Sequence, residues 1–230
     1  MNRTRFQQGL DDLKQKLLQM GGMAESAIEA AAESYLQRDP KLCQLVFERE
    51  DSINAAERTI DELALDLLAM QQPMAIDLRF IVAVLKINSD IERVGDQAVN
   101  IAQRVMDLIA LPKAELAADI PKMAATSANM IRQSLQAFVS GSADVANEVL
   151  EADDTVDRMN QEVLVAMVKA MEDNPEHIPQ ALDTIIIARN LERVADHATN
   201  IAEDVIFWVR GADVRHRVGL DPEDRPAMPQ

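Results

Sequence analysis

The side chains best suited to chemistry lie in a stretch of sequence that occurs twice. Residues 92–102 read ERVGDQAVNIA and residues 192–202 read ERVADHATNIA, so eight of the eleven positions are identical. Packing alone would preserve the apolar positions, but the repeat also retains a glutamate, an arginine, an aspartate and an asparagine. We therefore expect one polar site in each half of the chain.

Helical spacing brings the acidic side chains of each copy together. Glu92, Asp96 and Asn100 are four residues apart, which sets them along one face of an α-helix. Two carboxylates at this spacing repel each other by roughly 0.3 kcal/mol in water, and by more when partly buried. A protein that keeps both should supply a cation, either a metal ion or an arginine. The second copy repeats the pattern with Glu192, Asp196 and Asn200.

Further oxygen ligands precede each copy. Asp51 and Asn54 are three residues apart in the first half, and Asp154 and Asp157 take the equivalent positions in the second. Oxygen-only clusters suit hard or borderline cations, so the expected metal is Mg²⁺, Mn²⁺ or iron. The first site, with Asn54, should bind more weakly. The candidate metal ligands are Asp51, Glu92, Asp96, Asp154, Asp157, Glu192 and Asp196.

A second interpretation is that the motif forms a solvated helix face without a ligand. Glutamate and arginine pairs followed by an aspartate are common on exposed helices, and Arg93 or Arg193 would then pair with acidic side chains of neighbouring helices. The occurrence of two near-identical copies favours a site, but both interpretations remain open from the sequence.

Catalysis has little support. No histidine follows a glutamate by three residues, as a ferritin-like di-iron centre would require, and no phosphate-binding glycine loop or nucleophile motif is present. We expect His177, His197 and His216 at the surface and Cys43 in the core. The sequence thus favours a protein that is not an enzyme, with a metal-dependent helical enzyme or a metal store as the alternative.

The elements that must position these residues are helices. Glycine is scarce, with 7 residues, aromatic residues make up 3% of the chain, and helical periodicity can be followed almost end to end. Breaks at Asp39-Pro40, Gln72-Pro73 and Pro112 close the first three helices. The predicted helices cover about residues 4–38, 40–70, 74–111, 120–139 and 143–171, with a sixth that ends near residue 210.

Three helices followed by three helices predict an all-α protein of two tandem three-helix bundles related by internal duplication. The expected units are residues 1–112 and residues 113–210, followed by a mobile tail at residues 211–230. The tail contains two glycines, three prolines and mixed charges without apolar periodicity.

Weaker matches extend the repeat beyond the motif. They occur at an offset of 103 residues, as for Met20 with Met123, whereas the offset is 100 at the motif itself. Gly21 and Gly22 stand inside the first helix and have no counterpart in the second half. Because glycine costs about 1 kcal/mol relative to alanine in a helix, we expect a kink or a close helix contact there.

The charge of the chain restricts its partners. With 23 basic and 39 acidic residues the net charge is −16, which repels nucleic acid and anionic lipid and favours cations or a basic protein surface. A single cysteine excludes an intrachain disulfide, and the longest strongly apolar run, residues 80–85, is far below the roughly 20 residues of a membrane span. We expect a cytoplasmic protein that binds no nucleic acid and reaches a membrane only through partners.

Three segments together strongly resemble the PhoU family, the cytoplasmic accessory proteins of the bacterial phosphate-specific transporter. They are residues 71–79 (QQPMAIDLR), residues 89–96 with 99–102 (SDIERVGD and VNIA), and residues 190–202 (NLERVADHATNIA). The resemblance covers about residues 4–217. It implies a pair of three-helix bundles, often dimeric, that binds metal in some members through Glu/Asp-x-x-x-Asp motifs.

The resemblance also implies a function and partners. Members of the family repress the phosphate-starvation response and restrain phosphate uptake by contacting the transporter ATPase and the sensor histidine kinase. We therefore expect a regulatory adaptor with these two partners and a homodimer. Candidate partner-binding residues beside the acidic motifs are Arg79, Arg93, Asn100, Arg193 and Asn200.

Overall fold

The computed structural model describes residues 2–71 and 73–211, and every regular element in this part of the chain is helical. The all-α prediction is confirmed, and each predicted helix is present with ends that differ by a few residues. The helices are α1 (Asn2–Gln37), α2 (Pro40–Gln71), α3 (Ala75–Ala110), α4 (Ile120–Ser140), α5 (Ala143–Asp173), a short 3₁₀ helix η1 (Pro175–His177) and α6 (Ile178–Arg210). The predicted tail from residue 212 onward lies outside the described residues.

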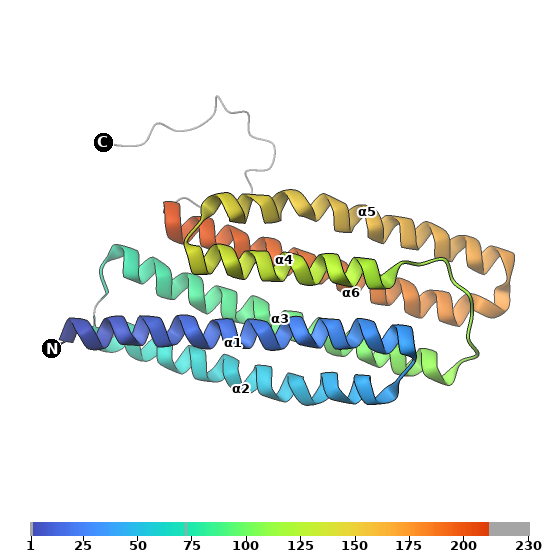
Figure 1. The fold of residues 1–230 in the computed structure, drawn as a ribbon, viewed down its shortest axis with the longest axis horizontal. Coiled ribbons are helices and arrows are strands. Elements are labelled where there is room, and N and C mark those ends of the chain that lie inside the picture. The colour runs from blue at the N-terminus through green and yellow to red at the C-terminus, as the bar shows by residue number, and fades with distance from the viewer. Residues whose placement is uncertain (1, 72, 212–230) are drawn as a thin grey trace, which may run out of the picture.

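The six long helices form two three-helix bundles. α1, α2 and α3 pack on one another, as do α4, α5 and α6, and the bundles join through contacts of α3 with α6 and of α1 with α4 (Figure 1). In this view α1 and α4 lie in front of α3 and α6, while α2 and α5 lie at opposite edges. α2 and α5 therefore contact only elements of their own bundle. The two-bundle prediction is confirmed.

Polar contacts along α3 and α6 show that these helices run antiparallel. Arg104 near the end of α3 pairs with Asp183 near the start of α6, with 3.5 Å between guanidinium and carboxylate. Toward the opposite ends, the Lys86 ammonium lies 2.9 Å from the Asp204 carboxylate. The repeat makes α3 and α6 equivalent at an offset of 100 residues. Because these equivalent helices pack antiparallel, the two bundles are related by an approximate two-fold axis.

The His197 side chain lies between the bundles, contrary to the surface position expected from the sequence. Its Nδ1 is 2.9 Å from Oδ1 of Asp90, which is only 7% exposed, and Nδ2 of Asn200 donates to the same Asp90 oxygen at 3.3 Å. A buried carboxylate on α3 thus holds a ring on α6. The expectation failed because Asp90 lies 107 residues away in sequence, and no local pattern reports that distance.

Local capping explains where the helices end. The Lys41 amide donates to the Asp39 side chain at 2.9 Å at the start of α2, and Ser142 accepts from the Val145 amide at 3.3 Å at the start of α5. Between α1 and α2, Arg38 takes a positive φ of 53°, and its guanidinium donates to carbonyl oxygens of Leu108 and Leu111 at 2.5 and 2.7 Å. Arg38 therefore satisfies carbonyls at the end of α3 that have no partner within the helix.

Gly21 marks a close contact between the two bundles. A Cβ atom built there would overlap Cδ1 of Leu135 on α4, whereas a Cβ at Gly22 would meet nothing within 4 Å. α1 continues through both glycines as one helix. Of the two predicted explanations, the close helix contact is therefore the one present at Gly21.

Buried apolar side chains of all six helices form the core, and no helix among the described residues has the length and apolar character needed to cross a membrane. Cys43 is fully buried, as expected.

Candidate functional site

Each acidic motif meets carboxylates from the helix that precedes it. In the first bundle Glu92 and Asp96 on α3 face Glu50 and Glu57 on α2. Burial, then the charges of Asp96 and Glu57, raise the pKa of Glu92, while the nearby Arg93 lowers it. Burial, followed by Asp96 and Asp51, likewise raises the pKa of Glu50. We call Glu50, Asp51, Glu57, Glu92 and Asp96 the first acidic cluster.

The second bundle repeats the arrangement between α5 and α6. Burial raises the pKa of Asp153 to about 6, and the charges of Asp157, Asp196, Asp154 and Glu192 contribute in that order. One carboxylate oxygen of Asp153 is buried and has no hydrogen-bond partner. The second acidic cluster consists of Asp153, Asp154, Asp157, Glu192 and Asp196. Five carboxylates from two helices are therefore close enough to disfavour one another's ionisation.

Arginines of the motif do not neutralise these clusters. Burial, then Asp196 and Asp157, raise the pKa of Glu192, although Arg189 and Arg193 lower it. Burial, then Asp157, raise that of Asp196 against the opposing effects of His197 and Arg193. Arg193 is exposed, and the ion pairs within 4 Å among the described residues do not include it. The excess negative charge at each cluster remains available to an external cation.

Three members of the clusters, Glu50, Glu57 and Asp153, are missing from the sequence prediction. Glu50 and Asp153 precede Asp51 and Asp154 directly, and they are related by the same offset of 103 residues. That shared offset was a usable signal, because it places an acidic pair at the same position of both halves. Asp153 is also the side chain whose pKa is raised to about 6.

The other predicted residues occupy different positions. Arg93 is exposed beside the first cluster, and Asn100 is half-buried one turn beyond Asp96. Asn200 turns away from the second cluster to donate to Asp90, and the Arg79 Nε donates at 3.4 Å to the Trp208 carbonyl near the end of α6. The structure therefore brings the predicted acidic residues together in each bundle and uses Asn200 and Arg79 at the junction between bundles.

The carboxylates gather without converging on a point. Within residues 2–71 and 73–211 no group of three or more His, Cys, Asp or Glu side chains is arranged to hold a metal ion. Asp154, Asp157 and Asp196 are exposed, and exposed side chains exchange rotamers within nanoseconds. Metal binding at these residues stays a prediction.

Comparison with known proteins identifies the family. A family model described as the PhoU domain matches the chain twice, at residues 17–105 and 120–205. The chain belongs to the PhoU family. One PhoU domain falls in each three-helix bundle, so the internal repeat is the family's domain present in two copies. The limits at residues 112 and 210 remain predictions.

Named PhoU relatives match over nearly the whole chain. The phosphate-specific transport system accessory protein PhoU homolog of Pseudomonas aeruginosa is 39% identical over 216 residues, which cover 94% of this chain and 89% of that protein. The homolog of Caulobacter vibrioides is 32% identical over 89% of this chain and 90% of its own length.

Solved PhoU structures have the same fold. The crystal structure of PhoU from Pseudomonas aeruginosa superposes with a TM-score of 0.85 at 38% identity, over 90% of this chain and all of that one. The phosphate transport system regulatory protein PhoU from Streptococcus pneumoniae gives a TM-score of 0.84 at 28% identity, over 91% and 99% of the two chains.

Proposed function

We propose that this protein is a regulatory accessory protein of a phosphate transport system, which represses the phosphate-starvation response and restrains phosphate uptake when phosphate is plentiful. The observation that carries the proposal is the match of both bundles to the PhoU domain, together with an accessory protein as a relative at 39% identity over 94% of the chain. No residue constellation in the described part of the chain supports a reaction, so the proposed role is not enzymatic.

The expected partners are the ATPase subunit of the transporter and the phosphate sensor histidine kinase. Two features support protein contacts. Long helices hold the outer surfaces of α2 and α5 rigid, and each of these helices contributes acidic side chains to one cluster. Negative surfaces of this kind attract basic patches and accelerate association. The adaptor would work in the cytoplasm, reach the membrane through the transporter, and self-associate as a homodimer.

Cation binding at the clusters is part of the proposal. The donor set fits, because carboxylate oxygens suit Mg²⁺, Mn²⁺ or iron, and one oxygen of Asp153 is buried without a hydrogen bond. Asp153, Asp157, Glu192 and Asp196 would hold a cation in the second bundle. When bound, a cation would supply positive charge that offsets the mutual repulsion of these groups.

Deletion of the gene in its own bacterium tests the function. In phosphate-replete medium the deletion should switch on alkaline phosphatase and raise phosphate uptake, and the wild-type gene should restore both. Unchanged expression and uptake after deletion would overturn the proposal.

A second arm of the same experiment tests the role of the clusters. The variant gene replaces the four motif carboxylates by alanine, at Glu92, Asp96, Glu192 and Asp196, and should fail to restore repression. A matched control removes four exposed acids outside the clusters, at Glu48, Glu151, Glu172 and Asp173, and should behave as wild type. Repression by the cluster variant equal to that of wild type would show that the clusters have no part in signalling.

A further inference from the structure

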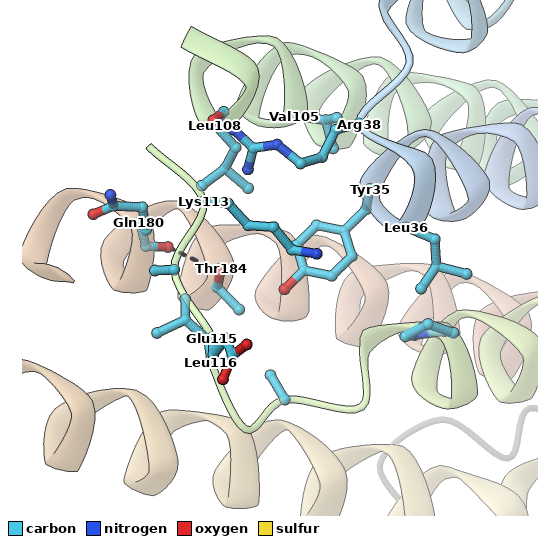
Figure 2. Close-up of a pocket in the computed structure, with 13 residues that line it drawn as sticks. Tyr35, Leu36, Arg38, Val105, Leu108, Lys113, Glu115, Leu116, Gln180 and Thr184 are labelled. Atoms are coloured by element: carbon cyan, nitrogen blue, oxygen red, sulfur yellow. Dashed lines mark hydrogen bonds between the residues drawn. The ribbon is translucent and has the colours of Figure 1, made fainter. Parts of the chain in front are cut away.

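A cavity of about 360 Å³ lies where the two bundles meet the segment between α3 and α4 (Figure 2). It is bounded by the ends of α1 and α3, the starts of α4 and α6, and residues 113–118 of the connecting segment. The volume falls in the range of about 300–1,000 Å³ that small-molecule sites occupy, and junctions between domains are frequent places for such sites.

The internal repeat shows what would fill a space of this kind. At the opposite end of the molecule the equivalent position holds three aromatic rings, of Phe80, Phe138 and Trp208, whose centroids are 5.3 to 5.5 Å apart. Phe138 is fully buried and Phe80 is 8% exposed. Rings from α3, α4 and α6 thus close that end with a packed aromatic core.

Each of the three rings has a counterpart at the cavity. Offsets of 100 and 103 residues pair Phe80 with Gln180, Trp208 with Leu108 and Phe138 with Tyr35, and all three counterparts line the cavity. Only Tyr35 keeps a ring. At the cavity, therefore, a glutamine of α6 and a leucine of α3 stand in place of the phenyl and indole rings that fill the other end.

The smaller side chains also make the cavity polar. Burial raises the pKa of the Tyr35 phenol, against smaller opposing effects of Thr184 and Arg38, so the hydroxyl stays protonated. Gln180 is only 5% exposed, and its Oε1 has no hydrogen-bond partner although its Nε2 donates to the Pro112 carbonyl at 3.1 Å. A buried acceptor without a partner points to a missing hydrogen-bond donor on this wall.

Charged side chains at the cavity favour an anion. Two cationic side chains, Arg38 and Lys113, and one carboxylate, Glu115, line the cavity. Figure 2 shows Lys113 running from the connecting segment into the space beside Tyr35. Arg38 already donates to carbonyl oxygens of α3, whereas Lys113 is in none of the ion pairs found among the described residues. Lys113 is therefore the cation best placed to bind a ligand.

We infer that this cavity binds a small planar aromatic molecule that carries an anionic group. The ring would take the place that the Trp208 indole occupies at the other end, against Tyr35 and between Leu108 and Leu116, and the anionic group would pair with Lys113. The site is separate from both acidic clusters and does not depend on the proposed function.

Three probes that differ in one property each test the inference by calorimetry and by amide chemical shifts of the full chain. Indole-3-acetate, a planar aromatic anion, should bind with a Kd below about 1 mM and shift amides of residues 113–118. Tryptamine keeps the aromatic ring system but is a cation. Cyclohexaneacetate keeps the negative charge, but its ring is saturated and not planar. Both should bind at least about tenfold more weakly.

Variants locate the binding. The double change Leu108→Trp with Gln180→Phe rebuilds the aromatic trio and should abolish binding while the chain remains folded, as judged by its melting temperature and helical circular dichroism. Lys113→Gln alters an exposed side chain and should weaken the binding of indole-3-acetate about tenfold. Lys122→Gln, at an exposed lysine outside the cavity, should leave the affinity unchanged. The inference would be overturned if indole-3-acetate did not bind, or if tryptamine bound as tightly. It would also be overturned if indole-3-acetate bound with unchanged affinity to the folded double variant or to Lys113→Gln.

Discussion

Asp90 Oδ1 lies 2.9 Å from Nδ1 of His197 and links the central helices of the two bundles. The internal symmetry pairs these positions with Asn190 and Gln97, which are also buried but are neutral amides, and the Oε1 of Gln97 has no hydrogen-bond partner. One half of the α3–α6 junction is thus joined through a carboxylate, and the other half is not. The duplicated bundles have diverged where they meet.

Replacement of Asp90 by alanine should destabilise the protein. The change leaves the His197 ring and the Asn200 amide without their acceptor in a part of the molecule where Asp90 is 7% exposed. Loss of a buried hydrogen-bond partner costs about 1–3 kcal/mol, measurable as the free energy of unfolding in urea. Gln103→Ala, at an exposed position of the same helix, should change it by less than about 0.5 kcal/mol. Equal stability of the two variants would contradict the role of Asp90.

The two adjacent glycines of α1 should respond in opposite directions to the same substitution. Gly21→Leu should cost about 1–3 kcal/mol, because its side chain would overlap Leu135 across the junction of the bundles. Gly22→Leu should stabilise by about 0.5–1 kcal/mol, since that position is open and leucine favours the helix. Urea unfolding of both variants checks the difference, and a gain in stability for Gly21→Leu would refute the close contact.

Ionisation of Asp153 should make stability depend on pH. Burial and the neighbouring carboxylates raise its pKa to about 6 from an ordinary value of 3.8, so the folded state holds this proton more tightly than the unfolded chain does. The resulting stability is fully present below about pH 4 and is lost as the pH rises through about 6. Asp153→Asn should therefore gain stability over wild type at pH 7.5 and show little gain at pH 4.5.

Unfolding in urea at the two pH values measures that gain. Glu151→Gln removes one negative charge at an exposed position two residues away and serves as the control, with the same small effect at both pH values. A gain for Asp153→Asn that does not change with pH would show that burial of the carboxylate is not the cause.

Cations should bind the second acidic cluster more tightly than the first. Asp157 stands where the first half has Asn54, so at this position of the repeat the second cluster offers a charged carboxylate and the first a neutral amide. Titration of Mn²⁺ by calorimetry at pH 7.5 should show a loss of several-fold in affinity for Asp157→Asn and a gain for Asn54→Asp. If Mn²⁺ binds neither cluster, or if both variants match wild type, the interpretation of the clusters as cation sites fails.

Much of the fold could be predicted because helix limits depend on local chemistry. Asp39 caps α2, a proline at residue 112 follows the end of α3, and the Ser142 side chain caps α5, all within three residues of the helix ends they define. The duplicated motif likewise predicted two acidic sites, since i, i+4 spacing on a helix fixes which side chains share a face. These signals extend over a few residues and can be read without knowledge of the partner helix.

The sequence by itself therefore determined the helices, the duplication and one acidic pair per half. Only the tertiary structure decided which other groups join them. Glu50, Glu57 and Asp153 complete the clusters from a preceding helix, and His197 contacts Asp90 across the bundles. It also showed that one end of the repeat is filled by rings and the other is hollow. The physical reason is that contacts between helices depend on how rigid rods pack against each other, which spacing along one rod does not encode.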